Sequence, residues 1–470
     1  MAEAENTEKP VFSLRLLVDK KKNKVVLAEA GKEFVDVLFR FLTLPMGTVV
    51  RLLENYQKNQ KSEATVMIGC FNNLYKSVLD IGTANFMKEA CKDMLLYPIS
   101  VKENQRKQLK LNIDDIEVLK YYMCPKGCGR LYSNFCSSRC SCGELMRKES
   151  KTGHGVAYGE IFVSHKPLFT ITDNLKVGFT SISLTLKTLK VAGYSDVDQL
   201  HEMHVDVDHE KVLALLKCLF SSDTPLTDVF LTKERPCVIS KVLNMPSREE
   251  SGAVVQSNIV MSVSVFTRKQ DKKVLYIESE KDFVDLLFTF LVLPLNSAWK
   301  LAGSNLVLGC INNLFESFNS LSSIEGSNAL NSRCVLPWYY SCQQPLLDVC
   351  YAERNDLSLA TYPYTYKPMD PRCDKTSEFG VCSGFVKRGT TFIVSDDLTI
   401  TPMDLSSTIC SLKKWNMDLD DIEEQVITIS KAEAIRLLRA SFVTSTGLNT
   451  VFESLLLKKP KAEKVKGIIP

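Results

Sequence analysis

The chain carries much of its own sequence twice, and this repeat limits the folds it can adopt more than any other feature. Residues 24–45, KVVLAEAGKEFVDVLFRFLTLP, return as residues 273–294, KVLYIESEKDFVDLLFTFLVLP. Over Phe34–Pro45 and Phe283–Pro294, nine of twelve positions are identical. Four further matches follow in the same order: 68–77 with 308–317, 120–124 with 338–342, 169–177 with 392–400, and 196–220 with 418–442. We therefore predict a tandem duplication of one module.

The predicted modules have ordinary domain sizes. Residues 1–243 form the first, residues 259–457 form the second, and the polar run 244–258 reads as a linker between them. Residues 458–470, KKPKAEKVKGIIP, form a basic tail. Solvated disorder is the favoured interpretation of the tail, and contact with phosphates is the alternative.

Each module mixes strands and helices without regular alternation. A hairpin with a lysine-rich turn opens both copies and leads into a helix that is apolar nearly all round, ending at Pro45 or Pro294. The later elements are a helix (72–79, 312–318), a strand (169–177, 392–400), a helix starting near 182 or 405, a short strand, and a last helix. Ser430 and Glu433 form a capping box there, and Asp208 is the equivalent cap. The predicted class is α+β.

The start of the sequence and its cysteine content indicate the cellular compartment in which the protein is expected. The start, MAEAENTEKP, has no apolar signal region, and the most apolar stretch, residues 34–50, contains Asp36, Arg40 and Pro45, so neither a signal peptide nor a membrane span is expected. Sixteen cysteines in such a chain indicate a reducing compartment, the cytoplasm or the nucleus.

Five of those cysteines lie within residues 124–143. They are Cys124, Cys128, Cys136, Cys140 and Cys142. Two close pairs with adjacent glycines are typical of a zinc knuckle, so four of these five are predicted to hold a structural zinc ion. The spacing does not choose between Cys136 and Cys140 as the third ligand. Incidental buried thiols are the alternative, while the absence of HExxH and of a CxxC helix start disfavours a catalytic zinc or a redox role.

The second copy lacks an equally dense cluster. Its cysteines, Cys342, Cys350, Cys373 and Cys382, are spread widely, so either that copy has no site or it assembles a looser one. The metal is therefore predicted to be an addition to the first copy, and not a requirement of the module.

Three histidines of the first copy lie close together in sequence, but the repeat argues against a site. His201, His204 and His209 correspond to Glu423, Val426 and Lys431 in the second copy. Such unlike replacements are typical of solvated positions, so metal binding by these histidines is disfavoured.

Polar residues shared by both copies are better candidates for a function. They are Asp36 with Asp285, Asn72 and Asn73 with Asn312 and Asn313, and Asp173 with Asp396 in apparent turns. A carboxylate inside a buried helix is costly, so Asp36 is predicted to be hydrogen-bonded or ion-paired. The asparagines are predicted to cap helices, with ligand binding as the alternative. No catalytic residue is assigned.

The lysine-rich hairpin turns, 20–24 and 269–273, are solvated charges by default. Two such turns could form one anion-facing surface, which is a nucleic-acid hypothesis without interleaved aromatic residues. No nucleotide-binding glycine loop, GxSxG or kinase signature is present in the sequence.

The motifs resemble a known family. Four stretches of the chain are together similar to the plant family called domain of unknown function 674, and the resemblance extends over nearly the whole chain. The stretches are LRLLVDKKKNKVVLAEAGKEFVDVLFRFLTLPMGTVVRL, IGCFNNLYKSV, YYMCPKGCG…CSCGELM and FTITDNLKV. The resemblance implies a flowering-plant origin and no particular chemistry. The family pattern favours CxxC pairs, whereas this chain has CxxxC and a CxC that ends at Cys142.

Three functions fit these features. The first is a non-enzymatic intracellular protein that uses a zinc-stabilised first module to bind a protein partner. The second is a nucleic-acid binder that uses the hairpins, the knuckle and the basic tail. The third is an enzyme with a cleft between the modules that uses shared residues such as Asp36 and Asn73.

Overall fold

The computed structural model shows a mixed α+β protein, as predicted. It describes residues 11–60, 67–99, 109–114, 120–150, 161–163, 168–232, 260–303, 306–322, 335–340, 346–347, 349–352, 359–361, 364–372, 384–406, 408–409, 413 and 418–456. The predicted linker 244–258 and the basic tail 458–470 lie outside these residues.

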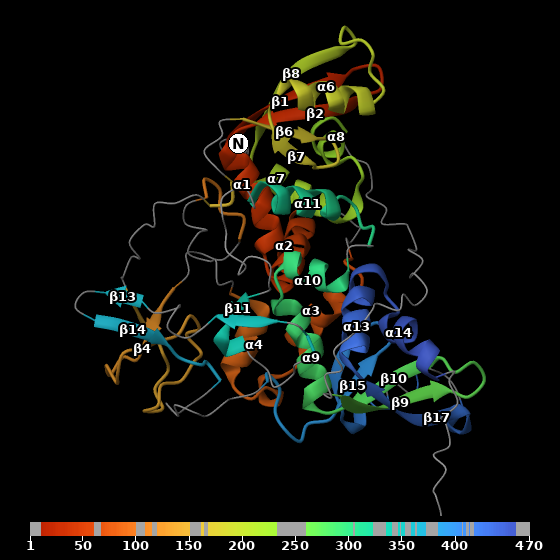
Figure 1. The fold of residues 1–470 in the computed structure, drawn as a ribbon. Coiled ribbons are helices and arrows are strands. Elements are labelled where there is room, and N and C mark those ends of the chain that lie inside the picture. Colours follow the sequence, from red (N-terminus) through yellow and green to blue (C-terminus); the bar gives the residue numbers. More distant parts are fainter. Residues whose placement is uncertain are drawn as a thin grey trace, which may run out of the picture.

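Two five-stranded antiparallel sheets are built in the same way and lie at opposite ends of the molecule, with helices between them (Figure 1). The first contains β1 (Phe12–Asp19), β2 (Lys24–Ala30), β6 (Phe169–Thr172), β7 (Val177–Phe179) and β8 (Leu200–Val207), in the order β7-β6-β2-β1-β8. The second contains β9 (Met261–Arg268), β10 (Val274–Ser279), β15 (Phe392–Ser395), β16 (Ile400–Pro402) and β17 (Ile422–Ile429), in the order β16-β15-β10-β9-β17. Matching strands therefore occupy matching places.

The hairpins predicted at the start of each half are present, with Asn23 at φ 47° and Lys272 at φ 57° in their turns. The single strand predicted over 169–177 is wrong, because β6 and β7 are two strands of a hairpin whose turn holds Leu175 at φ 59°. The same correction applies to 392–400, where Leu398 has φ 60°. A residue with positive φ cannot continue an extended strand.

Helices fill the space between the sheets. The first half contains α1 (Lys32–Thr43), α2 (Met46–Asn59), α3 (Phe71–Asp80), η1 (Thr83–Asn85), α4 (Glu89–Leu96), α6 (Ile182–Val191), α7 (His209–Ser221) and α8 (Pro225–Phe230). The second contains α9 (Lys281–Val292), α10 (Leu295–Ala302), α11 (Ile311–Ser322), η4 (Trp338–Tyr340), η6 (Leu419–Asp421), α13 (Lys431–Val443) and α14 (Gly447–Leu456). The predicted capping box of Ser430 and Glu433 and the predicted cap at Asp208 are confirmed.

Helix α1 is buried along its whole length from Phe34 to Thr43, as its sequence indicates. It ends before Pro45, but sequence analysis missed that a second helix, α2, begins at Met46 with Pro45 as its N-cap. Pro294 separates α9 from α10 in the same way. Proline is well suited to a helix start because the N–H that it lacks has no partner within the helix there.

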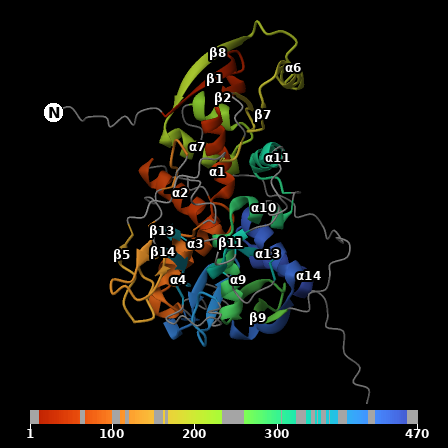
Figure 2. The same ribbon diagram turned by 60° about the vertical axis from the view of Figure 1, so that its left-hand side comes forward.

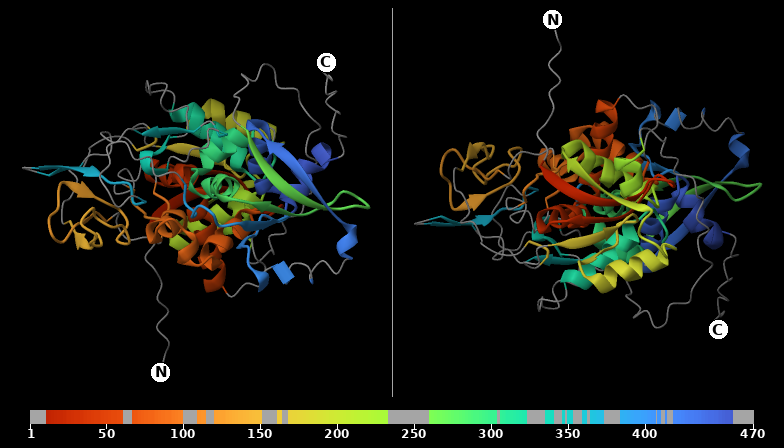
Figure 3. Two further views of the ribbon diagram at one scale, coloured as in Figure 1. Left: turned by 90° about the horizontal axis from the view of Figure 1, so that it is seen from below. Right: turned by 90° about the horizontal axis from the view of Figure 1, so that it is seen from above.

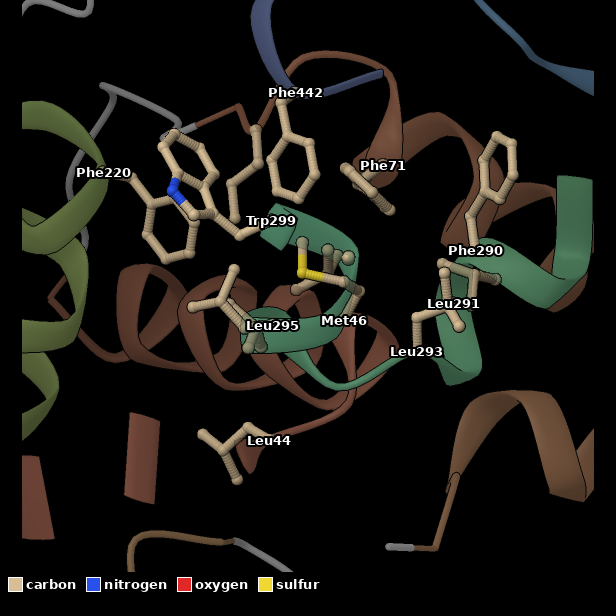
Figure 4. Packing of buried hydrophobic residues seen from close by; sticks show 14 of the residues in the cluster. Leu44, Met46, Phe71, Phe220, Phe290, Leu291, Leu293, Leu295, Trp299 and Phe442 are labelled. Atoms are coloured by element: carbon tan, nitrogen blue, oxygen red, sulfur yellow. The ribbon is translucent and has the colours of Figure 1, made fainter. Parts of the chain in front are cut away.

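The two proline corners meet at the centre of the molecule. Pro45 and Pro294 form an antiparallel bridge. The N–H of Met46 donates to the carbonyl of Leu293 and the N–H of Leu295 donates to the carbonyl of Leu44, both at 2.9 Å. Figure 4 shows these flanking side chains packed together with Trp299 and Phe442. The halves therefore cross at a fully buried point.

Beyond this crossing, each half places a helix against the sheet of the other. Helix α3 contacts β16, and helix α11 contacts β7. The N–H of Ile400 donates to the Ser77 hydroxyl at 2.8 Å, and the N–H of Val177 donates to the Ser317 hydroxyl at 2.9 Å. These bonds occupy matching positions of the repeat, so the exchange of helices is reciprocal.

A second reciprocal contact precedes each exchanged helix. The Cys70 N–H donates to the Ser441 carbonyl, and the Cys310 N–H donates to the Leu219 carbonyl, both at 2.9 Å. The buried apolar residues of both halves belong to one continuous core. The halves are thus not separate globular units within the described part of the chain.

A small lobe projects from one side of this body, as Figures 2 and 3 show. It contains β3 (Tyr122–Met123), β4 (Leu131–Tyr132), β5 (Lys148–Glu149), β13 (Leu359–Thr361) and β14 (Tyr364–Pro368). Strand β4 pairs in parallel with β14, so the lobe joins the cysteine-rich segment of the first half to a hairpin of the second. A further pair, β11 (Val335–Pro337) and β12 (Cys350–Ala352), is also parallel.

The contact at Gly69 gives a test of the interlocked halves. Gly69 has φ 46°, and a Cβ there would lie 2.2 Å from the Ser441 carbonyl oxygen. Gly193 has φ 83° with no atom within 4 Å of such a Cβ, so Gly193→Ala carries only the backbone cost of about 1–2 kcal/mol. We expect Gly69→Ala to lower the free energy of unfolding by about 1–3 kcal/mol more than Gly193→Ala.

Denaturant titration followed by tryptophan fluorescence measures both variants. Trp299 reports on this region because its ring lies 5.6 Å from that of Phe442. Equal losses of stability in the two variants would contradict the close contact between the halves.

Candidate metal centre

Two tight turns bring the cysteines of the lobe together. In the first, the N–H of Gly127 donates to the carbonyl of Cys124 at 3.0 Å. In the second, the N–H of Gly143 donates to the carbonyl of Cys140 at 2.8 Å. Gly143 has φ 87°, a conformation that glycine adopts without strain. The sequence therefore reverses direction beside each cysteine pair and turns the sulfurs inward.

Four sulfur atoms converge, and the structure includes Cys140 rather than Cys136 among them. The group consists of Cys124, Cys128, Cys140 and Cys142, whose Sγ atoms all lie within 4.8 Å of one another. The Sγ atoms of Cys124 and Cys142 are 3.5 Å apart. Tetrahedral zinc with Zn–S bonds of about 2.3 Å requires sulfurs about 3.8 Å apart, so the donor set fits this ion. Cys136 is exposed and lies outside the group.

Hydrogen bonds to the sulfurs favour thiolate at one end of the cluster. Burial raises the pKa of Cys124, but hydrogen bonds from the backbone N–H groups of Cys128 and Lys126 and from the neighbouring thiols together lower this pKa to about 7. The opposite holds for Cys128, whose hydrogen bond with the Cys142 sulfur is the largest of several effects that raise its pKa to about 12. Four thiolates side by side repel one another, and a divalent cation would remove that repulsion.

The cluster has buried apolar neighbours and lies in a segment with an excess of basic residues. Met146 and Met369 are buried against Cys124 and Cys140, and Met369 comes from the second half. Residues 120–150 hold six Lys or Arg and two Glu, an excess that offsets the net negative charge of a zinc ion with four thiolates. The cluster is therefore anchored by both halves and electrostatically balanced.

The prediction for the looser cysteines of the second half stays untested, because their side chains are not among those that the structure describes. Cys342, Cys373 and Cys382 lie outside the described residues, and Cys350 belongs to strand β12. Of the histidines, His201 and His204 are exposed on β8, and none of His201, His204 and His209 joins a group of potential ligands among the residues that the structure describes. The exposure of His201 and His204 agrees with the solvated role predicted for them, whereas His209 is half-buried at the start of α7.

The shared aspartates of α1 and α9 accept hydrogen bonds from the backbone of segments that lie about 100 residues or more further along the chain. One carboxylate oxygen of Asp36 accepts the N–H groups of Phe162 and Val163, at 3.1 and 3.3 Å. Asp285 accepts those of Phe385 and Val386 in the same way, at 2.7 and 3.1 Å. Asp285 also pairs with the Lys281 ammonium at 2.8 Å. Both residues are hydrogen-bonded, as predicted for a carboxylate in this helix.

The shared asparagines do not cap their helices, contrary to the sequence-based prediction. The N-cap positions are Cys70 in α3 and its counterpart before α11, and no side-chain cap bond is formed at Cys70. The amide of Asn73 donates to the Asp397 carbonyl and that of Asn313 donates to the Asn174 carbonyl, both at 2.9 Å. These side chains fasten each helix to the hairpin turn of the other half.

The neighbouring asparagines act locally. Asn72 accepts the N–H of Ile68 at 2.9 Å and donates to Glu54, and Asn312 donates to Glu316 at 3.0 Å. Sequence analysis also missed Ser77 and Ser317, although both end the matched motifs IGCFNNLYKS and LGCINNLFES. Their identity in the repeat was the available signal.

The shared aspartates of the turns cap helices. Asp173 accepts the backbone N–H and the hydroxyl of Thr227 at the start of α8, both at 2.9 Å. Asp396 accepts the N–H of Asn449 at 2.8 Å in α14.

The basic hairpin turns of β1–β2 and β9–β10 lie far apart in Figures 1 and 2. No described helix has both the length and the apolar character needed to cross a membrane.

The cysteine pair at 136 and 140 provides a matched test of the metal centre. We expect Cys140→Ser to reduce bound zinc to below half an equivalent, because it removes one of four convergent sulfurs. Cys136→Ser should bind as much zinc as the parent protein, since Cys136 is exposed outside the group. Elemental analysis of the purified variants measures both, and loss of zinc only in Cys136→Ser would contradict this assignment.

Asp36 gives a pH-dependent test. Burial raises its pKa from 3.8 to about 6, so the folded protein binds this proton more tightly than the unfolded chain does. Its contribution to stability is therefore greatest below pH 4 and is lost as the pH rises through 6. Asp36→Asn keeps an acceptor without the charge, so its stability relative to the parent should increase as pH rises from 4 to 6.

Asp36→Ala is the control for that prediction. It leaves the buried N–H groups of Phe162 and Val163 without their acceptor, so it should be about 1–3 kcal/mol less stable than Asp36→Asn at every pH. Denaturant titrations between pH 4 and 8 measure all three proteins. Equal destabilisation by Asn and Ala would show that the hydrogen bonds at Asp36 do not stabilise the fold.

Comparison with known proteins identifies the family. A family model described as "Protein of unknown function (DUF674)" matches residues 8–432. No curated protein and no solved structure matches the chain. Because the match covers most of the sequence, the chain belongs to the DUF674 family, as the resemblance of its motifs indicated.

Proposed function

We propose that this protein is a non-enzymatic, intracellular protein-interaction protein with a structural zinc site in its first module. The observation that carries the proposal is the convergence of Cys124, Cys128, Cys140 and Cys142 in a lobe that projects from the body (Figure 3). A closed set of four thiolates leaves no open position for substrate, which is the arrangement of structural zinc sites.

We also propose that the chain arose by tandem duplication of one module. Matching sheets, proline corners and exchanged helices support this origin. The module boundaries 1–243 and 259–457 follow from the repeat, although the exchange of α3 and α11 means that each module completes the other. The lobe is then an addition to the first module that rests on β14 of the second.

The cysteines support the intracellular placement. The nine whose side chains are described, namely Cys70, Cys91, Cys124, Cys128, Cys136, Cys140, Cys142, Cys218 and Cys310, are free thiols. Burial raises the pKa of Cys70, Cys91 and Cys310 to about 12, so these three are unreactive core residues. A reducing compartment, the cytoplasm or the nucleus, suits this set.

The interlocked halves support an interaction role over catalysis between the modules. The surfaces where the halves meet belong to a continuous apolar core, and the shared residues Asn73 and Asn313 are engaged in hydrogen bonds between the halves. The lobe instead presents exposed basic side chains, among them Arg147 just before strand β5 and Lys148 within it. We propose this face as the one that meets an acidic surface of a protein partner.

Zinc content tests the first part of the proposal. The purified full-length protein should contain one zinc ion per chain, and Cys124→Ser/Cys128→Ser should contain almost none, because two ligands are lost. Less than half an equivalent in the parent protein would contradict a zinc site.

Charge reversal tests the partner. Arg147→Glu/Lys148→Glu should keep its zinc but lose proteins that cross-link to the parent protein in native extracts, while Lys190→Glu on α6 should keep them. Unchanged cross-linking would contradict the lobe as the binding surface. Salt-sensitive retention of the parent on single-stranded DNA, lost in the lobe variant, would assign the lobe to nucleic acid instead.

A further inference from the structure

A cavity of 560 Å³ lies between helix α6 and the edge of the first sheet. Strands β2, β6 and β7 form its floor, and Leu184, Lys187, Thr188 and Val191 of α6 form its roof. These roof positions recur with the spacing of one helix face. The volume falls within the range of small-molecule sites, which is about 300–1,000 Å³. One face of α6 thus borders a cavity instead of packing fully onto the sheet.

Helix α6 is held in place at both ends, so the cavity is a built feature of the fold. At its start, the Ser181 hydroxyl accepts the N–H of Leu184 at 3.1 Å. Leu184 then packs so closely on Gly178 that a Cβ there would lie 2.8 Å from it. Beyond its end, the Tyr194 hydroxyl donates to the Asp19 carboxylate at 2.9 Å, and the Lys22 ammonium lies 4.6 Å from the centre of the Tyr194 ring.

The lining combines apolar and cationic groups. Val26, Val177, Leu184 and Val191 contribute apolar surface, and Lys22, Lys24, Lys176 and Lys187 contribute four ammonium groups. Lys22 already pairs with Asp19 at 3.6 Å. The charge of Lys24 acts on Asp173, whose pKa burial nevertheless raises. Lys176, from the turn between β6 and β7, and Lys187, from the helix, have no carboxylate partner among the residues that the structure describes.

The carboxylates in the lining leave this positive charge available. Asp173 is engaged by the backbone and hydroxyl of Thr227, and Asp223 is the only other acidic residue of the lining. Four lysines therefore face two aspartates. An anion that enters the cavity would meet Lys176 and Lys187 without having to displace an existing ion pair.

The second half shows that the fold does not require all of these lysines. Matched through the repeat, Lys22 corresponds to Asp271, Lys24 to Lys273 and Lys176 to Thr399. The turns that carry Lys176 and Thr399 are alike, with Leu175 and Leu398 at φ 59° and 60°. Lys22 and Lys176 are thus specific to the first half, although both halves build the same sheet.

We propose that the cavity under α6 binds one small amphipathic anion per chain. Its apolar part is covered by the valines and by Leu184, and its carboxylate or phosphate is bound by Lys176 and Lys187. The site is independent of the cysteine lobe, which lies in another part of the molecule (Figure 1). The two proposals can therefore fail separately.

Calorimetric titration of the full-length protein, as purified, with decanoate and with decyl phosphate tests the site and distinguishes the two anionic groups. We expect saturable binding of at least one of them at one molecule per chain, and no binding of decyltrimethylammonium. Lys176→Gln/Lys187→Gln should weaken this binding by about tenfold or more. Thr188→Phe should also weaken it, because the larger side chain occupies part of the cavity.

Lys190→Gln is the matched control, since Lys190 is an exposed lysine of the same helix that does not line the cavity. It should bind both probes as the parent protein does. Failure of both anions to bind, a stoichiometry of two per chain, or equal weakening by Lys190→Gln would each overturn the proposal. Thermal denaturation of every variant establishes that it is folded.

Discussion

The antiparallel contact between Pro45 and Pro294 is the constraint on which the rest of the structure depends. Two hydrogen bonds of 2.9 Å join the flanking residues, Leu44 to Leu295 and Met46 to Leu293. The crossing directs the chain that follows each proline toward the other half. There, α3 packs against β16 of the second sheet and α11 packs against β7 of the first. Because these contacts are buried, separating the halves would expose the core and leave backbone groups unpaired. The chain should therefore unfold as one cooperative unit.

This arrangement decides where function can reside. The residues that look most suggestive in the repeat, the aspartates of α1 and α9 and the asparagines of α3 and α11, hold the halves together or hold incoming backbone. The features that are present in one half only do not serve to hold the fold together. The cysteine lobe and the lysine-lined cavity both depend on residues that the second half lacks, and neither is needed to build a sheet. We infer that the shared core supports the fold and that the additions to the first half carry the function.

The sequence predicted local features well and long-range ones poorly. The hairpins, the buried helix α1, the capping box at Ser430 and the α+β class follow from periodicity and cap residues close together in the chain. Helix α2 was missed because a proline was interpreted only as a helix end. The exchange of helices could not be predicted, since a helix that packs on its own sheet and one that packs on a partner sheet need the same apolar face. The spacing of the cysteines predicted five possible ligands without choosing among them. Only the conformation of the turns shows that Cys140, and not Cys136, belongs to the group of four.

Amide hydrogen exchange at Val177 and Ile400 tests the interlocked core most directly. Each of these N–H groups donates to a serine of the other half, Ser317 or Ser77. If the halves form one cooperative unit, both amides should exchange only through global unfolding, with the same free energy of opening as the central strands of both sheets. Exchange of either amide through a smaller, local opening, while the central strands stay protected, would show that the exchanged helices detach independently and would contradict the account.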